Sequence, residues 1–266
     1  MITLGIIGFG NMGEACIKGL TEANIFSTLL VAEKYHQRLT YAMDTYNAVD
    51  YTNNISQMVD QADAIILAIK PQDLPELGTI LKNSPTNPKG KFISLLAGKT
   101  ISEIQQTLHG EMVIRLMPNL AALVQKALTG IAYGLNCTDE FKAIGLATAK
   151  AMGSWLEVPE HLMATVTGLS GSGIAYALQY LHAMALAGTK TGISYGQSLQ
   201  AAMDVMEGAI ALTRYTKRNP VDTITSISSP GGTTIAGIHQ LEAKGFTDAI
   251  ITAVEATVKR SDELSK

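Results

Sequence analysis

Three glycines near the start of the chain restrict the possible fold more than any other feature. Gly8, Gly10 and Gly13 follow a short apolar run at residues 3–7 and precede a stretch with the apolar spacing of a helix, which reaches Leu20. In this context the first glycine permits a tight turn, the second lets the backbone approach a pyrophosphate, and the third lets the helix pack closely on the strand. The helix then presents free N–H groups and its positive dipole end to the phosphates. The pattern therefore predicts a dinucleotide site rather than a turn that is only structural.

Strand-like and helix-like segments alternate through the first 158 residues. The predicted strands are residues 3–7, 28–32, 64–69, 92–96, 113–117 and 127–133, and helices are predicted at 35–46 and 140–152. This alternation predicts an α/β fold with an N-terminal Rossmann-type, doubly wound parallel sheet. Ligands of such sheets lie beyond the carboxyl ends of the strands. Lys70, Ala97 and Asn119 each follow a strand and are therefore candidates for the cofactor side.

The residues after the second strand bear on the choice of nicotinamide cofactor. Glu33 ends that strand, 20 residues beyond Gly13. An acid at this place can bind the ribose hydroxyls and repel a 2′-phosphate, which slightly favours NADH. Lys34, His36 and Arg38 follow at once and could receive that phosphate, so both NADPH and NADH stay open.

The second half of the chain is predicted to be entirely helical. We expect a nucleotide-binding domain at residues 1–158 and a helical domain at 159–266, with helices at 161–188 (interrupted at 168–173), 194–218, 233–245 and 246–265. Residues 174–188 and 199–212 are apolar on nearly all sides, and a helix of that kind is normally buried. About a hundred residues cannot hide so much apolar surface alone. We therefore expect an interlocked homodimer through these helices; the alternative is a monomer that buries them against its own nucleotide domain.

Composition excludes several classes of partner. The chain has 266 residues, a formal net charge of −3 and no basic stripe, so nucleic acid is not an expected partner. Its apolar runs, such as residues 64–69, are far shorter than the ~20 residues that span a bilayer. The start of the chain has no signal-like segment, and we expect a cytoplasmic protein. Two cysteines and five histidines show no ligand spacing, so no metal site is predicted.

An uncharged loop in the helical half carries the strongest chemical signal. The segment "SISSPGGTTIAG", residues 226–237, is rich in hydroxyls and glycines and directly precedes an apolar helical pattern. The glycines expose the backbone, and the first N–H groups of the following helix have no intrahelical partners. Such groups can bind a carboxylate without lysine or arginine. The alternative is that Ser229 or Thr233 only caps the helix.

The absence of charge in this loop indicates the type of reaction. The helical half has no Ser–His–Asp order, no paired carboxylates and no lysine in a glycine-rich loop, which a hydroxy-acid dehydrogenase would need as its base. Reduction of a C=N bond suits an uncharged site, because the substrate nitrogen can bring its own proton as an iminium. The enzyme then supplies mainly alignment of the hydride.

Six segments together resemble the pyrroline-5-carboxylate reductase family over essentially the whole chain. They are "IGFGNMGEACIKGL", "AIKPQ", "SLLAGKT", "RLMPN", "GLSGSGIAYAL" and "SSPGGTTIAGIHQLEAKGF". The resemblance implies a Rossmann domain, a helical dimerisation domain, dimers often gathered into larger rings, and reduction of 1-pyrroline-5-carboxylate to L-proline with NADPH or NADH.

The resemblance also implies roles for individual residues. Besides the motif residues Gly8, Gly10, Gly13, Glu33 and Lys34, it places Phe9, Asn11, Met12, Lys70, Pro71 and Ala97 at the cofactor. It places Ser229, Gly231, Gly232, Thr233 and Thr234 at the substrate, with Thr234 as the catalytic hydroxyl that hydrogen-bonds the ring nitrogen.

The chain departs from the family pattern in three places. The family usually continues "MPN" with Thr-Pro and a glycine pair, where this chain has "LAALVQKA" at residues 120–127. Ile174 replaces a usual proline, and Thr225 replaces a frequent acid. The alternatives are therefore a related imine reductase or a non-catalytic regulatory relative with the same fold. A 3-hydroxyacid dehydrogenase shares the glycine-rich opening but does not explain "SSPGGTT".

Overall fold

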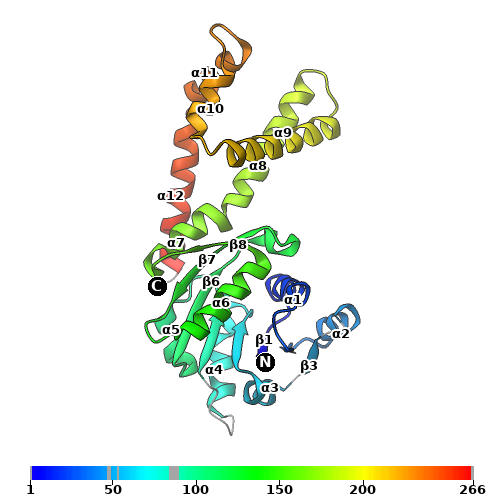
Figure 1. Cartoon of the computed structure of the whole chain (residues 1–266), viewed down its shortest axis with the longest axis vertical. Helices are drawn as coiled ribbons and strands as arrows, with labels where there is room; N and C mark the ends of the chain where they lie inside the picture. The colour runs from blue at the N-terminus through cyan, green and yellow to red at the C-terminus, as the bar shows by residue number, and fades with distance from the viewer. Residues whose placement is uncertain (1, 47–48, 53, 84–89, 265–266) are drawn as a thin grey trace. The chain divides into compact units, whose positions relative to one another are not determined.

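The computed structural model describes residues 2–46, 49–52, 54–83 and 90–264. Its central feature is an eight-stranded sheet with the strand order β3-β2-β1-β4-β5-β6-β7-β8 (Figure 1). The strands are β1 (Thr3–Ile7), β2 (Thr28–Ala32), β3 (Asp50–Thr52), β4 (Ala64–Leu67), β5 (Lys91–Ser94), β6 (Met112–Met117), β7 (Ala127–Tyr133) and β8 (Gly153–Glu157). The strand order reverses between β1 and β4, the kind of switch point at which open α/β sheets bind ligands.

The expected doubly wound sheet is confirmed, with one antiparallel pair. All neighbouring strands run parallel except β6 and β7, where Ile114 pairs with Tyr133 and Met117 with Gly130. Only residues 118–126 join these two strands, which is too short for the crossover that a parallel pair requires. The short β3 was not predicted, because three residues give no readable alternation.

Helices cover both faces of the sheet. They are α1 (Asn11–Ala23), α2 (His36–Thr45), α3 (Ile55–Gln61), α4 (Leu74–Lys82), α5 (Ile101–Leu108) and α6 (Asp139–Met152). One apolar core joins residues of α1, α2 and α6 to one face, and a second joins residues of α3, α4 and α5 to the other. Gly19 of α1 lies against the backbone of Ala151, so α1 and α6 pack with almost no separation.

The segment after β8 contains short helical turns. They are the 3-10 turn η3 (Glu160–Leu162), α7 (Met163–Val166) and the π-helical turn η4 (Thr167–Gly171). Contacts between residues divide the chain into one unit of residues 1–172 with 257–266 and a second unit of residues 173–256. The predicted boundary between residues 158 and 159 stays a prediction.

The second unit consists of helices, as the sequence predicted. They are α8 (Gly173–Lys190), α9 (Tyr195–Thr216), α10 (Pro220–Ile227), α11 (Thr233–Ala243) and α12 (Phe246–Leu264), the last of which extends beyond residue 256. A turn with Gly192 at φ +110° joins α8 to α9. The Tyr176 hydroxyl donates to the Ala253 carbonyl at 3.2 Å and links α8 to α12. No helix in the part of the chain that the structure describes is both long and apolar enough to cross a bilayer.

The helical unit leaves much of its apolar surface uncovered. Among its described helices, only Ala185, Ser198 and Ala202 are buried. Leu178 is 59% exposed and Val205 is 63% exposed. Monomers rarely leave so much contiguous apolar surface in water, so this surface favours a partner.

A charge at Val205 tests whether α9 is covered by a second chain. Val205 is 63% exposed in a single chain, so Val205→Asp should cost a monomer little, whereas a dimer interface would bury an unpaired charge. We expect Val205→Asp to give monomers or aggregates in sedimentation velocity. Leu135→Asp, at a fully exposed apolar residue after β7, is the control and should sediment as the wild type. Dimers of the Val205→Asp variant would show that this face is free.

Candidate functional site

The turn between β1 and α1 accepts only glycine at two positions. Gly8 has φ +99°, and a Cβ there would lie 2.7 Å from the Ala68 carbonyl oxygen. A Cβ at Gly13 would overlap the Gly8 carbonyl. Gly10 is the N-cap of α1 and provides no side-chain cap. The first N–H groups of α1 therefore lack a side-chain partner and suit the phosphates of a dinucleotide.

A cleft of about 330 Å³ lies beyond the carboxyl ends of β1, β2 and β4. Five predicted cofactor residues line it, namely Gly8, Gly10, Glu33, Lys34 and Lys70. Its far wall comes from the 3-10 turn η1 (Pro71–Asp73) and from α4. The location and the bare glycine turn fit the adenosine and phosphate part of a nicotinamide dinucleotide.

The other predicted cofactor residues do not line this cleft. Asn11, Met12 and Gly13 form the first turn of α1. Pro71 begins η1, and Ala97 is exposed on the turn between β5 and α5.

Phe9 differs from the sequence-based expectation in where its side chain lies. It is 3% exposed, and its ring lies 6.1 Å from the ring of Tyr41 and 6.0 Å from that of Tyr46. The aromatic ring thus packs between α1 and α2, and only the backbone of Phe9 is available to the glycine turn.

Glu33 uses both carboxylate oxygens to accept backbone N–H groups, one of them from the glycine turn. Its Oε2 accepts the Phe9 N–H at 2.7 Å, and its Oε1 accepts the Tyr35 N–H at 2.8 Å. The residue is 7% exposed. These two charge-assisted bonds occupy one acceptor position on each oxygen and fix the direction of the carboxylate. Sequence reasoning identified Glu33 but could not show that its oxygens are already engaged.

Two cations flank Glu33, and only one has an acidic partner among the described residues. Lys34 Nζ lies 3.4 Å from Asp73 Oδ1 and 3.8 Å from Glu76 Oε2. Burial lowers the pKa of Lys34, but the hydrogen bond and charge of Asp73 outweigh it and raise the pKa. Arg38 Nη1 lies 3.4 Å from the Phe9 carbonyl oxygen and forms no ion pair with a described residue. Arg38 therefore offers its charge to the cleft.

Asn119 was a candidate for the cofactor side, but its amide is used within the protein. Its Oδ1 accepts the Ala121 N–H at 3.1 Å, and its Nδ2 donates to Ser170 Oγ at 2.9 Å. Ser170 Oγ in turn donates to the Leu128 carbonyl at 2.7 Å. Asn119 thus joins β6, β7 and η4, and both atoms of its amide hydrogen-bond within the protein.

The loop between α10 and α11 forms a type II turn. The Gly232 N–H donates to the Ser229 carbonyl at 3.0 Å, with Pro230 and Gly231 at the two central positions. Gly231 has φ +70°, the left-handed value that this turn requires at its third residue. A Cβ at Gly232 would overlap the Ser229 side chain. The sequence "SPGG" is therefore dictated by the turn itself.

This turn leads directly into α11, whose first turn has no side-chain cap. Gly232 is the N-cap of α11, and no side chain caps this helix. Thr233 and Thr234 are its first two residues, and both are exposed in the single chain. Neither hydroxyl hydrogen-bonds to any residue within the described ranges. Capping by Ser229 or Thr233, the alternative from the sequence, does not occur, and the N–H groups stay open to an anion.

Comparison with known proteins identifies the family. Residues 160–264 match the family described as pyrroline-5-carboxylate reductase dimerisation, and residues 3–98 match NADP oxidoreductase coenzyme F420-dependent. The pyrroline-5-carboxylate reductase of Synechocystis sp. is 36% identical over 100% of this chain and 99% of its own. That of Methanosarcina acetivorans is 36% identical over 99% of this chain and 98% of its own. A solved pyrroline-5-carboxylate reductase from Coxiella burnetii, 28% identical, superposes with a TM-score of 0.88 over 100% of this chain and 99% of its own.

This chain belongs to the pyrroline-5-carboxylate reductase family.

The altered segment after "MPN" is a compact turn in this member of the family. Residues 120–124 form the 3-10 turn η2 (Leu120–Val124), and Gln125 closes it with φ +52°. Ala122 is buried in the core beside α1, and Lys18 Nζ donates to the Leu123 carbonyl at 3.2 Å. The departure from the family sequence therefore keeps an ordered turn packed on α1.

The role of Gly8 in binding a dinucleotide predicts a selective loss. Gly8→Ala forces a positive φ on alanine and places its Cβ against the Ala68 carbonyl, a strain of about 1–3 kcal/mol. We expect affinity for reduced nicotinamide nucleotides, measured by fluorescence titration, to fall at least about tenfold. Gly192→Ala, also at positive φ but with nothing within 4 Å, is the matched control and should bind normally. Wild-type affinity for Gly8→Ala would remove the glycine turn from the site.

Proposed function

We propose that this protein is a pyrroline-5-carboxylate reductase, which reduces 1-pyrroline-5-carboxylate to L-proline with NAD(P)H in the last step of proline biosynthesis. The observation that carries the proposal is the uncapped start of α11 after a glycine turn, an uncharged anion site in a chain that also has a dinucleotide cleft. Full-length relatedness to named reductases from a cyanobacterium and an archaeon supports it.

In this proposal the loop between α10 and α11 binds the substrate carboxylate. The N–H groups of Thr233 and Thr234, with the positive end of the α11 dipole, bind the carboxylate oxygens, and Ser229 adds a hydroxyl. Gly231 and Gly232 keep the approach to these N–H groups free of side chains.

Thr234 orients the reacting bond. Its hydroxyl has no partner among the described residues, and it lies one residue into α11, beside the carboxylate-binding N–H groups. We propose that it hydrogen-bonds the ring nitrogen and holds the C=N carbon in line for attack. Bound NAD(P)H supplies the hydride for that carbon. The C=N electron pair moves to nitrogen, and the iminium proton remains there as the N–H of proline.

The two alternative functions make different demands on the loop. A 3-hydroxyacid dehydrogenase needs a base to accept the hydroxyl proton, and residues 228–238 contain no titratable side chain. A related imine reductase would use the same loop with another imine. A comparison of NAD(P)H oxidation with pyrroline-5-carboxylate and with an imine that lacks the carboxylate separates a pyrroline-5-carboxylate reductase from a related imine reductase.

We propose a cytoplasmic homodimer that forms through the C-terminal helices. The match of residues 160–264 to the dimerisation family and the exposed apolar side chains of α8 and α9 support the dimer. Assembly of dimers into a larger ring stays a prediction from the family resemblance.

We further propose that NADPH is the preferred nucleotide. The carboxylate of Glu33 is engaged by two backbone N–H groups, while the guanidinium of Arg38 has no acidic partner among the described residues beside it. A 2′-phosphate would therefore meet an available cation, beside an acid whose two oxygens already accept backbone N–H groups. This geometry outweighs the slight preference for NADH that the mere presence of an acid at residue 33 suggests.

The catalytic role of Thr234 predicts a loss of turnover without a loss of fold. Thr234→Val keeps the shape and removes the hydroxyl. In an assay of NAD(P)H oxidation with pyrroline-5-carboxylate, kcat/KM should fall roughly ten- to a thousandfold. Nucleotide affinity and Tm should not change.

Thr252→Val is the matched control for Thr234→Val. Its hydroxyl donates to the Asp248 carbonyl at 2.8 Å and to the Ala249 carbonyl at 3.3 Å, both within α12, so activity should be retained. Full activity of Thr234→Val would contradict the assignment, and an inactive wild type would contradict the proposed function itself.

The NADPH preference predicts an effect confined to one nucleotide. Arg38→Ala removes one charge-assisted contact to phosphate, worth about 1.5–3 kcal/mol, so the KM for NADPH should rise about ten- to a hundredfold. The KM for NADH should change little. Lys34→Ala is the comparison, because Asp73 and Glu76 already engage that lysine and its effect should be smaller. An equal loss with both nucleotides would show that Arg38 does not contact the 2′-phosphate.

A further inference from the structure

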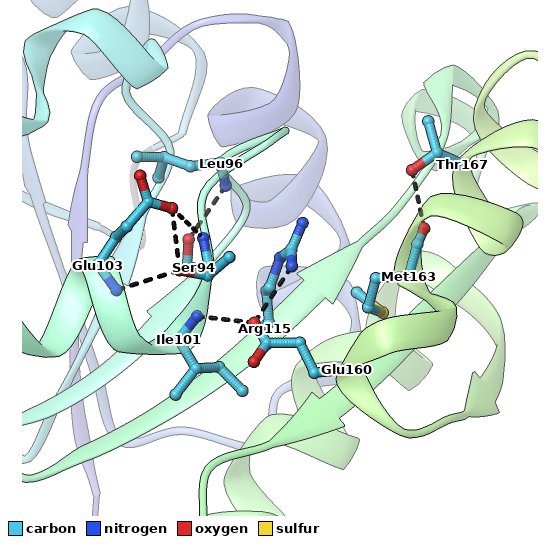
Figure 2. Close-up of polar contacts among 9 residues, drawn as sticks. Ser94, Leu96, Ile101, Glu103, Arg115, Glu160, Met163 and Thr167 are labelled. Atoms are coloured by element: carbon cyan, nitrogen blue, oxygen red, sulfur yellow. Dashed lines mark hydrogen bonds and ion pairs between the residues drawn. The ribbon is translucent and has the colours of Figure 1, made fainter. Parts of the chain in front are cut away.

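A buried arginine and a glutamate far from it in sequence meet at the start of α5 (Figure 2). Arg115 on β6 is 8% exposed, and its Nη1 lies 3.2 Å from Glu160 Oε1. The same carboxylate oxygen accepts the N–H of Ile101, the first residue of α5, at 2.7 Å. Glu160 therefore connects a central strand, a helix start and the segment after β8.

The apolar surroundings of Arg115 explain why this arginine needs an acidic partner. Alternation along β6 puts Arg115 on the same face as Val113, which belongs to the apolar core beneath α3, α4 and α5. Leu96 and Met163 belong to the same core. A guanidinium buried in such surroundings is stable only with a charged partner, and removal of either partner strongly destabilises a fold.

The turn between β5 and α5 is held from both of its ends. Near β5, Ser94 Oγ accepts the Leu96 N–H at 3.2 Å. At α5, Glu103 Oε2 accepts the Thr100 N–H at 2.7 Å and closes a capping box.

Glu103 and Glu160 hold the start of α5 from opposite sides. Burial raises the pKa of Glu103, but the hydrogen bonds from Thr100 and Lys99 outweigh it and lower the pKa. Glu103 thus holds the helix start from within α5, and Glu160 holds it from outside. Between these anchored points lie Ala97, which is exposed, and Gly98, which has φ +71°.

The place of this turn in the sheet gives it a role. β5 lies next to β4, on the side of β1 opposite β2 and Glu33. A dinucleotide whose adenosine ribose lies near Glu33 extends across the switch point toward the carboxyl ends of β4 and β5. The turn at residues 95–100 then faces the nicotinamide half, where the hydride leaves.

We propose that Arg115 and Glu160 are positioning residues, which fix the β5–α5 turn against the nicotinamide half of the bound nucleotide. The inference rests on the proposed function in one respect: its kinetic test needs the reduction of pyrroline-5-carboxylate. Neither residue needs to contact the nucleotide, because both act through the backbone of residues 95–101.

A double variant separates positioning from stability. Glu160→Leu alone leaves the buried Arg115 unpaired and should lower Tm, whereas Arg115→Met leaves Glu160, which is 33% exposed, and should lower Tm less. The combination replaces the ion pair with apolar side chains, a change that is often neutral or stabilising. Because only the Ile101 N–H then lacks its acceptor, the double variant should recover most of the lost Tm. Leu108→Ala is the control: it removes a buried side chain at the far end of α5, 2% exposed, and should lower Tm while kcat is retained.

If the pair positions the turn, the double variant should recover Tm but not turnover. We expect kcat with pyrroline-5-carboxylate to fall about ten- to a hundredfold at unchanged KM for the imine, the scale of a small misplacement of reacting groups. Amide hydrogen exchange at Ile101 should become faster, because its N–H loses the Glu160 acceptor.

A binding measurement tests the inference without turnover. The affinity for 2′-phospho-ADP-ribose, which lacks the nicotinamide, should be the same in the wild type and the double variant. NADPH should bind the wild type more tightly than this fragment does, and this difference in affinity should be smaller in the double variant. Should the double variant not fold, Glu160→Gln, which keeps an acceptor without the charge, allows the same comparison.

The outcomes are distinguishable. A double variant that regains Tm, wild-type kcat and wild-type affinity for NADPH would show that the pair only stabilises the fold and would overturn the inference. A wild-type protein without imine reductase activity would overturn the proposed function. The fragment and NADPH affinities would still decide the role of Arg115 and Glu160.

Discussion

Among the described helices, α1 and α11 each have a glycine as N-cap and therefore no side-chain cap, and both candidate binding regions depend on this omission. The N-cap residues are Gly10 in α1 and Gly232 in α11. By contrast, Thr100, Thr138 and Ser194 cap α5, α6 and α9 through their side chains. Glycine in place of a capping side chain costs a helix only a few tenths of a kcal/mol, and a bound anion offsets that cost by accepting hydrogen bonds from the free N–H groups. The protein is thus locally less stable where phosphates and a carboxylate are proposed to bind.

The parts of this arrangement that depend on local backbone geometry could be predicted from the sequence. Gly8 is needed for φ +99° and Gly231 for φ +70°, and each follows from a turn whose neighbours in sequence already define it. The strands other than β3 and β8, and the helical second half, followed from periodicity for the same reason. The antiparallel pairing of β6 with β7 could also have been predicted, because residues 118–126 are too few for a crossover.

Contacts between distant residues could not be predicted in this way. Whether Glu33 faces a ribose or the backbone depends on where Phe9 lies, 24 residues earlier. Arg115 and Glu160 are separated by 45 residues, and their sequence gives no sign of pairing. The best available signal was a single arginine inside the strand-like stretch "MVIRLM", since an arginine in a buried strand requires an acidic partner. Such a residue indicates that a partner exists without identifying it.

The lack of any charged side chain in the proposed substrate loop has a physical advantage for reducing an imine. The substrate carries a carboxylate and, in its reactive form, a protonated ring nitrogen close to it. A lysine ammonium ~6 Å from that nitrogen would repel it by about 3 kcal/mol at an effective dielectric constant of ~20. That repulsion would lower the pKa of the imine by about two units and deplete the iminium that accepts hydride. The N-terminus of α11 carries only about half a charge, so it can bind the carboxylate with about half of this penalty, and the neutral hydroxyl of Thr234 adds none.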